Sequence, residues 1–152
     1  MTATKLVILA GLGSLFLLIG ALMFQYLGDM PPCKMCYWQR YPHLLAVAVS
    51  VLIFFTQIER LKLLGLISAL ATSTIGAYHV GVEQDWWKGP QSCTSGSIDG
   101  LSTDDLIEQI MTATLVRCDD IPWQLFGISM AGWNVVISFM LAFLWFYALR
   151  LK

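Results

Sequence analysis

Residues 6–26 read LVILAGLGSLFLLIGALMFQY and carry no charged side chain. A helix needs roughly 20 apolar residues to cross the hydrocarbon core of a bilayer, which is about 30 Å thick. This run is long enough. It is also longer than the apolar core of a secretory signal peptide, about 7–15 residues, and no A-x-A cleavage pattern follows it. We therefore expect a retained membrane-spanning helix here.

Three further uncharged runs follow, at 41–58, 63–82 and 125–149. Of all residues, 57% are hydrophobic and 12% are charged, whereas about a quarter of the residues in a soluble domain are charged. None of the runs has the polar stripe that a helix of a soluble bundle requires. The sequence thus predicts an all-α membrane protein, a bundle of four transmembrane helices that forms a single integral membrane domain over residues 1–152.

The distribution of Lys and Arg predicts the orientation, because short cytoplasmic loops are enriched in these residues. Five basic residues lie near the termini and in the turn between the second and third runs: Lys5, Arg60, Lys62, Arg150 and Lys152. The other connections, 27–40 and 83–124, hold four basic residues but nine of the ten acidic ones. Both termini are therefore expected in the cytoplasm and these two loops outside it. The net charge of −1, with no basic run, argues against nucleic acid as a partner.

The loop 83–124 is the longer of the two and offers the place where a soluble partner could dock. Within it, Ser102 or Thr103 followed by two aspartates resembles a helix start. Apolar residues then recur at helical spacing: Leu106, Ile107, Ile110, Met111 and Leu115. We expect a short amphipathic helix, either in the membrane interface or packed on the top of the bundle.

All four cysteines, Cys33, Cys36, Cys93 and Cys118, fall in the two outer loops and none falls in a span. Inert free cysteines are usually buried and would favour the spans. Two pairs in the two outer loops therefore suggest two disulfides in an oxidising compartment.

Cys33 and Cys36 form a C-x-x-C motif after Pro31 and Pro32, a spacing that closes a small and reducible disulfide ring. If the second helix starts near residue 34, Arg40 lies one turn beyond Cys36. The cation and the helix N-terminus would then both favour the thiolate form of Cys36. A static disulfide or half of a metal site remain as alternatives for this motif.

Two metal-based alternatives compete with redox chemistry. Structural zinc sites usually present two tight pairs of ligands, whereas Cys93 and Cys118 are 25 residues apart. That spacing suits a flexible loop closed by a disulfide and exposed enough for attack by another protein's thiolate. The two histidines, His43 and His79, are expected at similar depth, which permits a bis-histidine haem, but such a haem would leave the cysteines unexplained. A contact from His79 to a quinone oxygen, or a simple interfacial role, is the other interpretation.

A redox relay also needs an electron acceptor of higher potential than a dithiol oxidant. The chain has no flavin or nicotinamide fingerprint, so a membrane quinone is the expected acceptor. Three function classes follow: a quinone-linked dithiol oxidase, a membrane haem- or metal-binding four-helix protein with structural disulfides, and a four-helix protein with static disulfides alone. Six tryptophans mostly mark the span ends, which is the pattern of an interfacial aromatic belt: Trp38, Trp86, Trp87, Trp123, Trp133 and Trp145. Three residues of the last span, Ser129, Gly132 and Asn134, are expected to mediate helix packing.

Taken together, these features resemble the disulfide bond formation protein B (DsbB) family, the membrane quinone reductases of bacterial disulfide formation. The resemblance rests on the four spans, the stretch PCKMCYWQR from Pro32 to Arg40, the loop cysteines, and CDDIPWQLFGIS from Cys118 to Ser129. The C-x-x-C motif precedes the loop pair, which distinguishes the chain from relatives of vitamin K epoxide reductase. The resemblance implies a location in the bacterial cytoplasmic (inner) membrane with the cysteines on the periplasmic side.

The resemblance also implies a role for each site residue. Cys93 forms the mixed disulfide with a periplasmic thioredoxin-fold partner of the DsbA type, and Cys118 is the other loop cysteine. Cys33 then exchanges with Cys118, which frees Cys36 as the thiolate that faces the quinone, ubiquinone or menaquinone. Arg40 assists quinone binding and His79 lies near the ring. No haem, flavin or metal is expected on this interpretation.

Overall fold

The computed structural model describes residues 2–90, 102, 104, 107, 111 and 116–151. It contains four long helices, α1 (Ala3–Tyr26), α2 (Lys34–Thr56), α3 (Leu61–Glu83) and α5 (Met130–Arg150). All four are long and apolar enough to cross a membrane. The predicted all-α membrane protein with four transmembrane helices is therefore confirmed.

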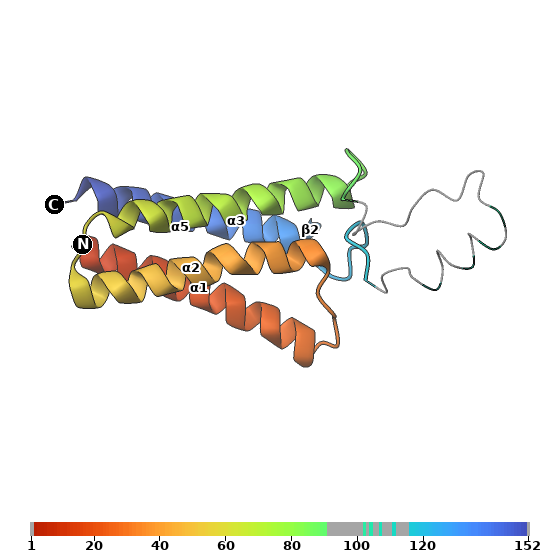
Figure 1. Ribbon diagram of the computed structural model, residues 1–152, viewed down its shortest axis with the longest axis horizontal. Coiled ribbons are helices and arrows are strands. Elements are labelled where there is room, and N and C mark those ends of the chain that lie inside the picture. Colours follow the sequence, from red (N-terminus) through yellow and green to blue (C-terminus); the bar gives the residue numbers. More distant parts are fainter. Residues whose placement is uncertain are drawn as a thin grey trace.

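The helices pack as an antiparallel bundle in the cyclic order α1, α2, α3, α5. Figure 1 shows both termini at one end of the bundle and the connection between α1 and α2 at the other. Toward this second end α1 diverges from its neighbours. Large apolar side chains on the outer faces are exposed, as with Phe16 at 74%, which suits contact with lipid.

Helix α2 begins at Lys34, well before the expected span at 41–58. Cys33 is the N-cap residue, and its Sγ accepts a hydrogen bond from the backbone N–H of Cys36 at 3.2 Å. Because the helix starts this early, Gln39 and Arg40 are helical residues and not loop residues. The sequence-based boundary was later because Lys34 and Arg40 interrupt the uncharged run.

Helix α5 begins at Met130, whereas the sequence-based span began at residue 125. The intervening residues form a two-stranded hairpin of β1 (Gln124–Leu125) and β2 (Ile128–Ser129). Phe126 and Gly127 both have positive φ at its turn, which is the geometry of a tight hairpin. The Ser129 side chain then caps α5 by accepting the Gly132 N–H at 3.1 Å. An uncharged run shows lipid compatibility but does not exclude a hairpin.

The part of the core far from the hairpin is built on close helix contacts. Trp145 of α5 is fully buried and packs on Gly65 of α3. It therefore does not belong to an interfacial aromatic belt. Of the expected amphipathic helix, Asp104, Ile107 and Met111 are helical, and the side chains of Ile107 and Met111 are exposed. Its other positions lie outside the described residues.

Candidate active site

Cys33, Cys36 and Cys118 meet at the end of the bundle where α2 begins. The Sγ atoms of Cys33 and Cys36 are 2.8 Å apart, and those of Cys33 and Cys118 lie within 4.8 Å of each other. Cys33 and Cys36 are free thiols. This spacing suits thiol–disulfide exchange, which requires attack of one sulfur on another. Cys93, the fourth predicted site cysteine, lies outside the described residues.

Different elements position these sulfurs. Cys33 is fixed as the N-cap of α2, immediately after two prolines. Cys118 is fully buried, in a cluster with Cys33, Met35 and Val82. The expectation that the loop pair is exposed is therefore wrong for Cys118. Its segment packs against the end of the bundle through the apolar contacts of Cys118 with Met35 and Val82.

Burial and hydrogen bonding shift the pKa values of Cys33 and Asp119 in opposite directions. The hydrogen bond with Cys36, together with burial, raises the pKa of the Cys33 thiol far above its usual range. In the segment that holds Cys118, Arg117 donates to both carboxylate oxygens of Asp119, at 3.0 and 2.5 Å. This pairing lowers the pKa of Asp119. The thiol of Cys33 is thus protonated at neutral pH in the reduced site, whereas Asp119 is ionised.

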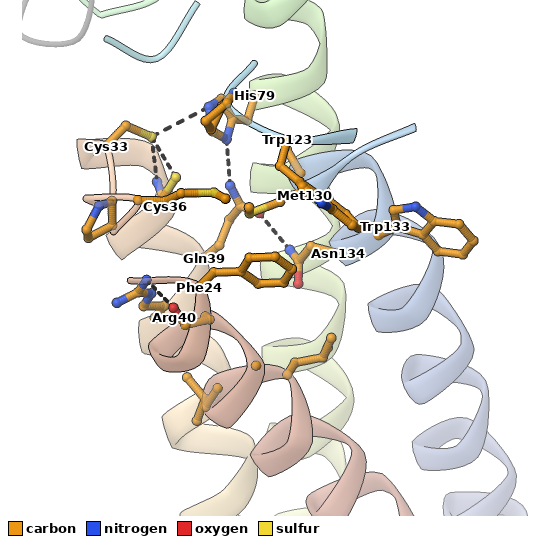
Figure 2. Close-up of a pocket in the computed structure, with 18 of the residues that line it drawn as sticks. Phe24, Cys33, Cys36, Gln39, Arg40, His79, Trp123, Met130, Trp133 and Asn134 are labelled. Carbon is orange, nitrogen blue, oxygen red and sulfur yellow. Dashed lines mark hydrogen bonds between the residues drawn. The ribbon is translucent and has the colours of Figure 1, made fainter. Parts of the chain in front are cut away.

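His79 of α3 points at the sulfur cluster (Figure 2). Its Nε2 is 3.6 Å from Cys33 Sγ and 3.1 Å from the backbone oxygen of Cys118. Its Nδ1 is 2.9 Å from Nε2 of Gln39. The imidazole therefore links the C-x-x-C motif, the loop cysteine and α2.

Gln39 and Asn134 extend this contact into the bundle as a buried polar chain. Asn134 Nδ2 donates to Gln39 Oε1 at 2.8 Å, and its Oδ1 accepts from His43 Nε2 at 2.9 Å. The two histidines thus lie at opposite ends of one hydrogen-bonded chain (Figure 2 shows its Gln39 part). Sequence reasoning assigned Gln39 to a loop and Asn134 to helix packing. A polar residue inside the predicted span 125–149 was the signal that could have identified Asn134, whereas Gln39 lay outside the predicted spans.

Glu83, the last residue of α3, is a second group that the sequence did not single out. Its side chain is buried, accepts a hydrogen bond from Ser129 at 2.5 Å, and lies 3.9 Å from His79 Nε2. A buried carboxylate is costly unless it is hydrogen-bonded. Its placement beside the imidazole marks it as part of the site.

Arg40 is anchored on α1. Its guanidinium donates to Gln25 Oε1 at 2.7 Å and to the backbone oxygen of Ala21 at 3.3 Å. The same group lies over the Tyr37 ring, 5.3 Å from the centroid. Arg40 therefore joins α1 to α2 one helical turn after Cys36.

A cavity of about 370 Å³ opens beside the sulfur cluster. Its polar end is formed by Cys33, Cys36, Arg40, His79 and Glu83. Its apolar part continues along α1 and α5 toward the middle of the bundle, past Phe24, Leu17, Phe16, Trp133 and Ile137. The cavity thus joins the cysteines to an apolar, membrane-embedded space.

Comparison with known proteins agrees with this architecture. The sequence model described as disulfide bond formation protein DsbB matches residues 3–148. The chain belongs to the DsbB family. It is therefore a multi-pass membrane protein of disulfide formation, a disulfide-generating oxidoreductase that exchanges disulfides with a partner.

Individual relatives of this DsbB-family chain are distant in sequence. Disulfide bond formation protein B of Shewanella sp. (strain ANA-3) is 30% identical over 123 residues, 76% of this chain and 69% of that protein. Disulfide bond formation protein B of Albidiferax ferrireducens is 29% identical over 136 residues, 78% of this chain and 74% of that protein. Uncharacterized protein RP370 of Rickettsia prowazekii (strain Madrid E) is 25% identical over 132 residues, 84% and 77% of the two chains. No solved structure matches the chain.

The ligand-type atoms of Cys33, His79 and Cys118 could also hold a metal ion, because all lie within 4.8 Å of one another. Thiolate and imidazole are the ligands that zinc prefers. A haem shared by the two histidines has less support, since Nε2 of His43 is engaged by Asn134 and Nε2 of His79 by the Cys118 carbonyl.

Proposed function

We propose that this DsbB-family chain re-oxidises a periplasmic thioredoxin-fold dithiol protein of the DsbA type and passes the electrons to a membrane quinone, ubiquinone or menaquinone. The observation that carries the proposal is the position of Cys36. Its Sγ contacts Cys33 at 2.8 Å, and Cys36 also lines the apolar cavity. This position supports a role in which one sulfur receives electrons from the cysteine cluster and passes them to a hydrophobic acceptor.

The proposed exchange starts from two disulfides, Cys33–Cys36 and Cys93–Cys118. A partner thiolate attacks Cys93, and Cys118 leaves as a thiolate. Cys118 then attacks Cys33, so that a Cys33–Cys118 bond forms and Cys36 leaves as a thiolate. The second thiol of the partner resolves the mixed disulfide and releases Cys93 as a thiol. At this point the partner has lost two electrons and two protons.

The return to the starting state transfers this electron pair out of the protein. A quinone supplies a two-electron, two-proton acceptor and becomes a quinol. Cys93 attacks Cys118 to restore the loop disulfide, which frees Cys33 to re-form its bond with Cys36. Support for the Cys33–Cys118 steps comes from the two sulfurs, which lie within 4.8 Å of each other.

The cavity fits a quinone in both of its parts. Cys36 and Arg40 line the polar end, where a ring carbonyl could meet the guanidinium. The apolar continuation along α1 and α5 suits an isoprenoid tail, and Phe16 in its lining is exposed at the outer face of α1. We further propose that the membrane is the bacterial cytoplasmic membrane, with both termini in the cytoplasm and the cysteines on the periplasmic side.

Purified protein in detergent tests the proposal. Incubated with a reduced DsbA-type partner and a soluble quinone analogue, it should consume one quinone for each partner dithiol that is oxidised. The Cys36→Ser variant should lose quinone reduction, because the sulfur that meets the acceptor is absent. Partner oxidation without quinone consumption, or full quinone reduction by Cys36→Ser, would contradict the proposal.

The partner-binding step is tested separately with loop variants on non-reducing gels. Cys118→Ser should accumulate a chain–partner mixed disulfide, because a mixed disulfide persists when the neighbouring thiol that could displace the partner is missing. Cys93→Ser should form none. Equal trapping by both variants would refute the separate roles.

A further inference from the structure

His79 lies between the side-chain amide of Gln39 and the backbone carbonyl of Cys118. The hydrogen-bonding roles of these two groups determine which ring nitrogen carries the hydrogen. Gln39 faces its Nδ1, and the Cys118 carbonyl faces its Nε2. A carbonyl oxygen only accepts hydrogen bonds, and an amide nitrogen only donates them. The tautomer therefore depends on whether nitrogen or oxygen of the Gln39 amide faces the ring.

The surrounding network fixes that orientation. Gln39 Nε2 lies 3.3 Å from the Met35 backbone oxygen and donates to it. Gln39 Oε1 accepts from Asn134 Nδ2 at 2.8 Å. Rotating the amide by 180° would place oxygen against the Met35 carbonyl and nitrogen against the Asn134 nitrogen. Both contacts would become repulsive.

The orientation of Asn134 is fixed in turn by Thr72. The Thr72 hydroxyl donates its single hydrogen to the Gln39 backbone oxygen at 3.0 Å, so it can only accept from Asn134 Nδ2, which is 3.1 Å away. A rotated Asn134 would present an oxygen to the Thr72 backbone oxygen, now 3.4 Å from Nδ2. The chain Thr72, Asn134, Gln39 therefore has one consistent direction.

We propose that Gln39 is a positioning residue that holds His79 as the neutral tautomer with its hydrogen on Nε2. Nδ1 accepts from the Gln39 amide, and Nε2–H donates to the Cys118 carbonyl with Cys33 Sγ 3.6 Å away. The imidazole thus presents a hydrogen-bond donor to Cys33 Sγ, the sulfur that leaves as a thiolate when Cys93 attacks Cys118 in the return step. This catalytic consequence rests on the proposed function.

The same tautomer protects the reduced site from metal ions. Cys33, Cys118 and His79 have the spacing of a soft-metal site. A metal can bind Nε2 only after its hydrogen has moved to Nδ1, where it would face the Gln39 N–H. Metal-bound histidines normally donate their other N–H to a carboxylate or carbonyl. Gln39 presents an N–H donor to Nδ1 in place of such an acceptor, so Nε2 of His79 is not available as a metal ligand.

The tautomer itself is measured on the reduced wild-type protein with ¹⁵N-labelled histidine. NMR chemical shifts distinguish a ring nitrogen that carries hydrogen from one that does not. We expect hydrogen on Nε2 and none on Nδ1 of His79. The chain has two histidines, so a His43→Gln spectrum assigns the signals. Hydrogen on Nδ1 would overturn the proposal without involving a quinone or a partner.

The variant Gln39→Glu tests the protective role. Its carboxylate can accept from Nδ1–H, which leaves Nε2 free as a ligand. We expect the reduced variant to bind Cd²⁺ at least about tenfold more tightly than wild type, within the range known for groups that orient metal ligands. Ultraviolet sulfur-to-cadmium charge-transfer absorption reports the binding. Replacing His79 by Leu in the Gln39→Glu background should abolish the gain.

Gln57→Glu is the matched control, because it makes the same change at the opposite end of α2. Its Cd²⁺ affinity should equal that of wild type. If Gln39→Glu also stays within about twofold of wild type, Gln39 has only a structural role and the proposal fails. Because the measurement needs neither quinone nor partner, its failure is distinct from a failure of the proposed function.

Discussion

Cys33 and Cys36 occupy unlike surroundings although two residues separate them. Cys33 is 5% exposed, and its raised pKa keeps the thiol protonated. Cys36 is half-buried and lines the cavity. Only a thiolate is a good nucleophile. The two cysteines should therefore differ in reactivity in the reduced protein.

We expect iodoacetamide to modify Cys36 of the reduced protein at pH 7–8, near the ordinary thiol range, well before Cys33. Since the pKa of Cys33 is raised, its thiolate stays scarce until the pH is far above that range. Peptide mass spectrometry after timed alkylation measures both rates. Denatured protein is the control and should show similar rates. Faster modification of Cys33 in the folded protein would contradict the assignment.

Arg40 is the residue for which two roles compete. Its hydrogen bonds to Gln25 and Ala21 show an anchor between α1 and α2, while its place in the cavity lining supports a contact with quinone. Arg40→Ala should raise the quinone KM by about tenfold, the loss of roughly 1.5 kcal/mol for a hydrogen bond to a charged group. Exchange between the partner and the loop cysteines should be largely unchanged.

Steady-state quinone reduction in detergent measures this effect. Gln25→Ala is the matched control, because it removes the anchoring partner but keeps the guanidinium. If both variants change the quinone KM equally, Arg40 is an anchor and does not contact the quinone.

The sequence predicted the site cysteines, Arg40 and His79 as candidates. The structure brings three of the cysteines and His79 into one cluster and Arg40 into the lining of the adjoining cavity, while Cys93 lies outside the described residues. Gln39, Asn134 and Glu83 were not predicted as site residues. Their contacts depend on residues far apart in the chain, such as the 95-position separation of Gln39 and Asn134. A hydrogen bond between distant helices has no periodic signal in a single sequence.

At the scale of elements, helix existence was predictable and helix boundaries were not. The sequence-based spans end at charged residues, because charged side chains are costly in lipid. Helix α2 nevertheless includes Arg40, because its guanidinium donates hydrogen bonds to α1. The hairpin before α5 was missed for a related reason. Its residues are uncharged, and its turn depends on positive φ at Phe126 and Gly127, a conformation that hydropathy does not report.

The contact between α3 and α5 gives a prediction about stability. A Cβ at Gly65 would lie 2.6 Å from carbons of the buried Trp145 ring, so Gly65→Ala must displace this ring or separate the two helices. Overpacking of this kind costs about 1–3 kcal/mol. Unfolding of the detergent-solubilised protein by a denaturant measures the loss.

Gly20→Ala is the control for this measurement, because no atom outside its own backbone lies within 4 Å of the added Cβ. It should be neutral or slightly stabilising, since alanine favours a helix. Equal stability of the two variants would show that Trp145 adapts and that the helices do not depend on this glycine.

At the scale of the whole molecule, the described cysteines cluster where α2 begins, and Figure 1 shows the termini at the opposite end of the bundle. We expect the cysteine end to face the periplasm. A variant with Cys36 as its single cysteine should react with an impermeant maleimide in intact spheroplasts. A Thr56→Cys variant without native cysteines should react only after lysis, because Thr56 is exposed at the opposite end of α2. Labelling of Cys36 only after lysis would reverse the topology.

The cavity that begins at Cys36 reaches Phe16 on the outward face of α1, so its far end borders lipid. An oxidant that enters there is delivered by two-dimensional diffusion within the bilayer. The quantity that governs its supply is then its mole fraction among the lipids, and not its amount per volume of suspension. Adding inert phospholipid to vesicles of fixed quinone and protein content would dilute the oxidant without changing any bulk concentration. Turnover of the molecule is thereby coupled to the composition of the membrane that surrounds it.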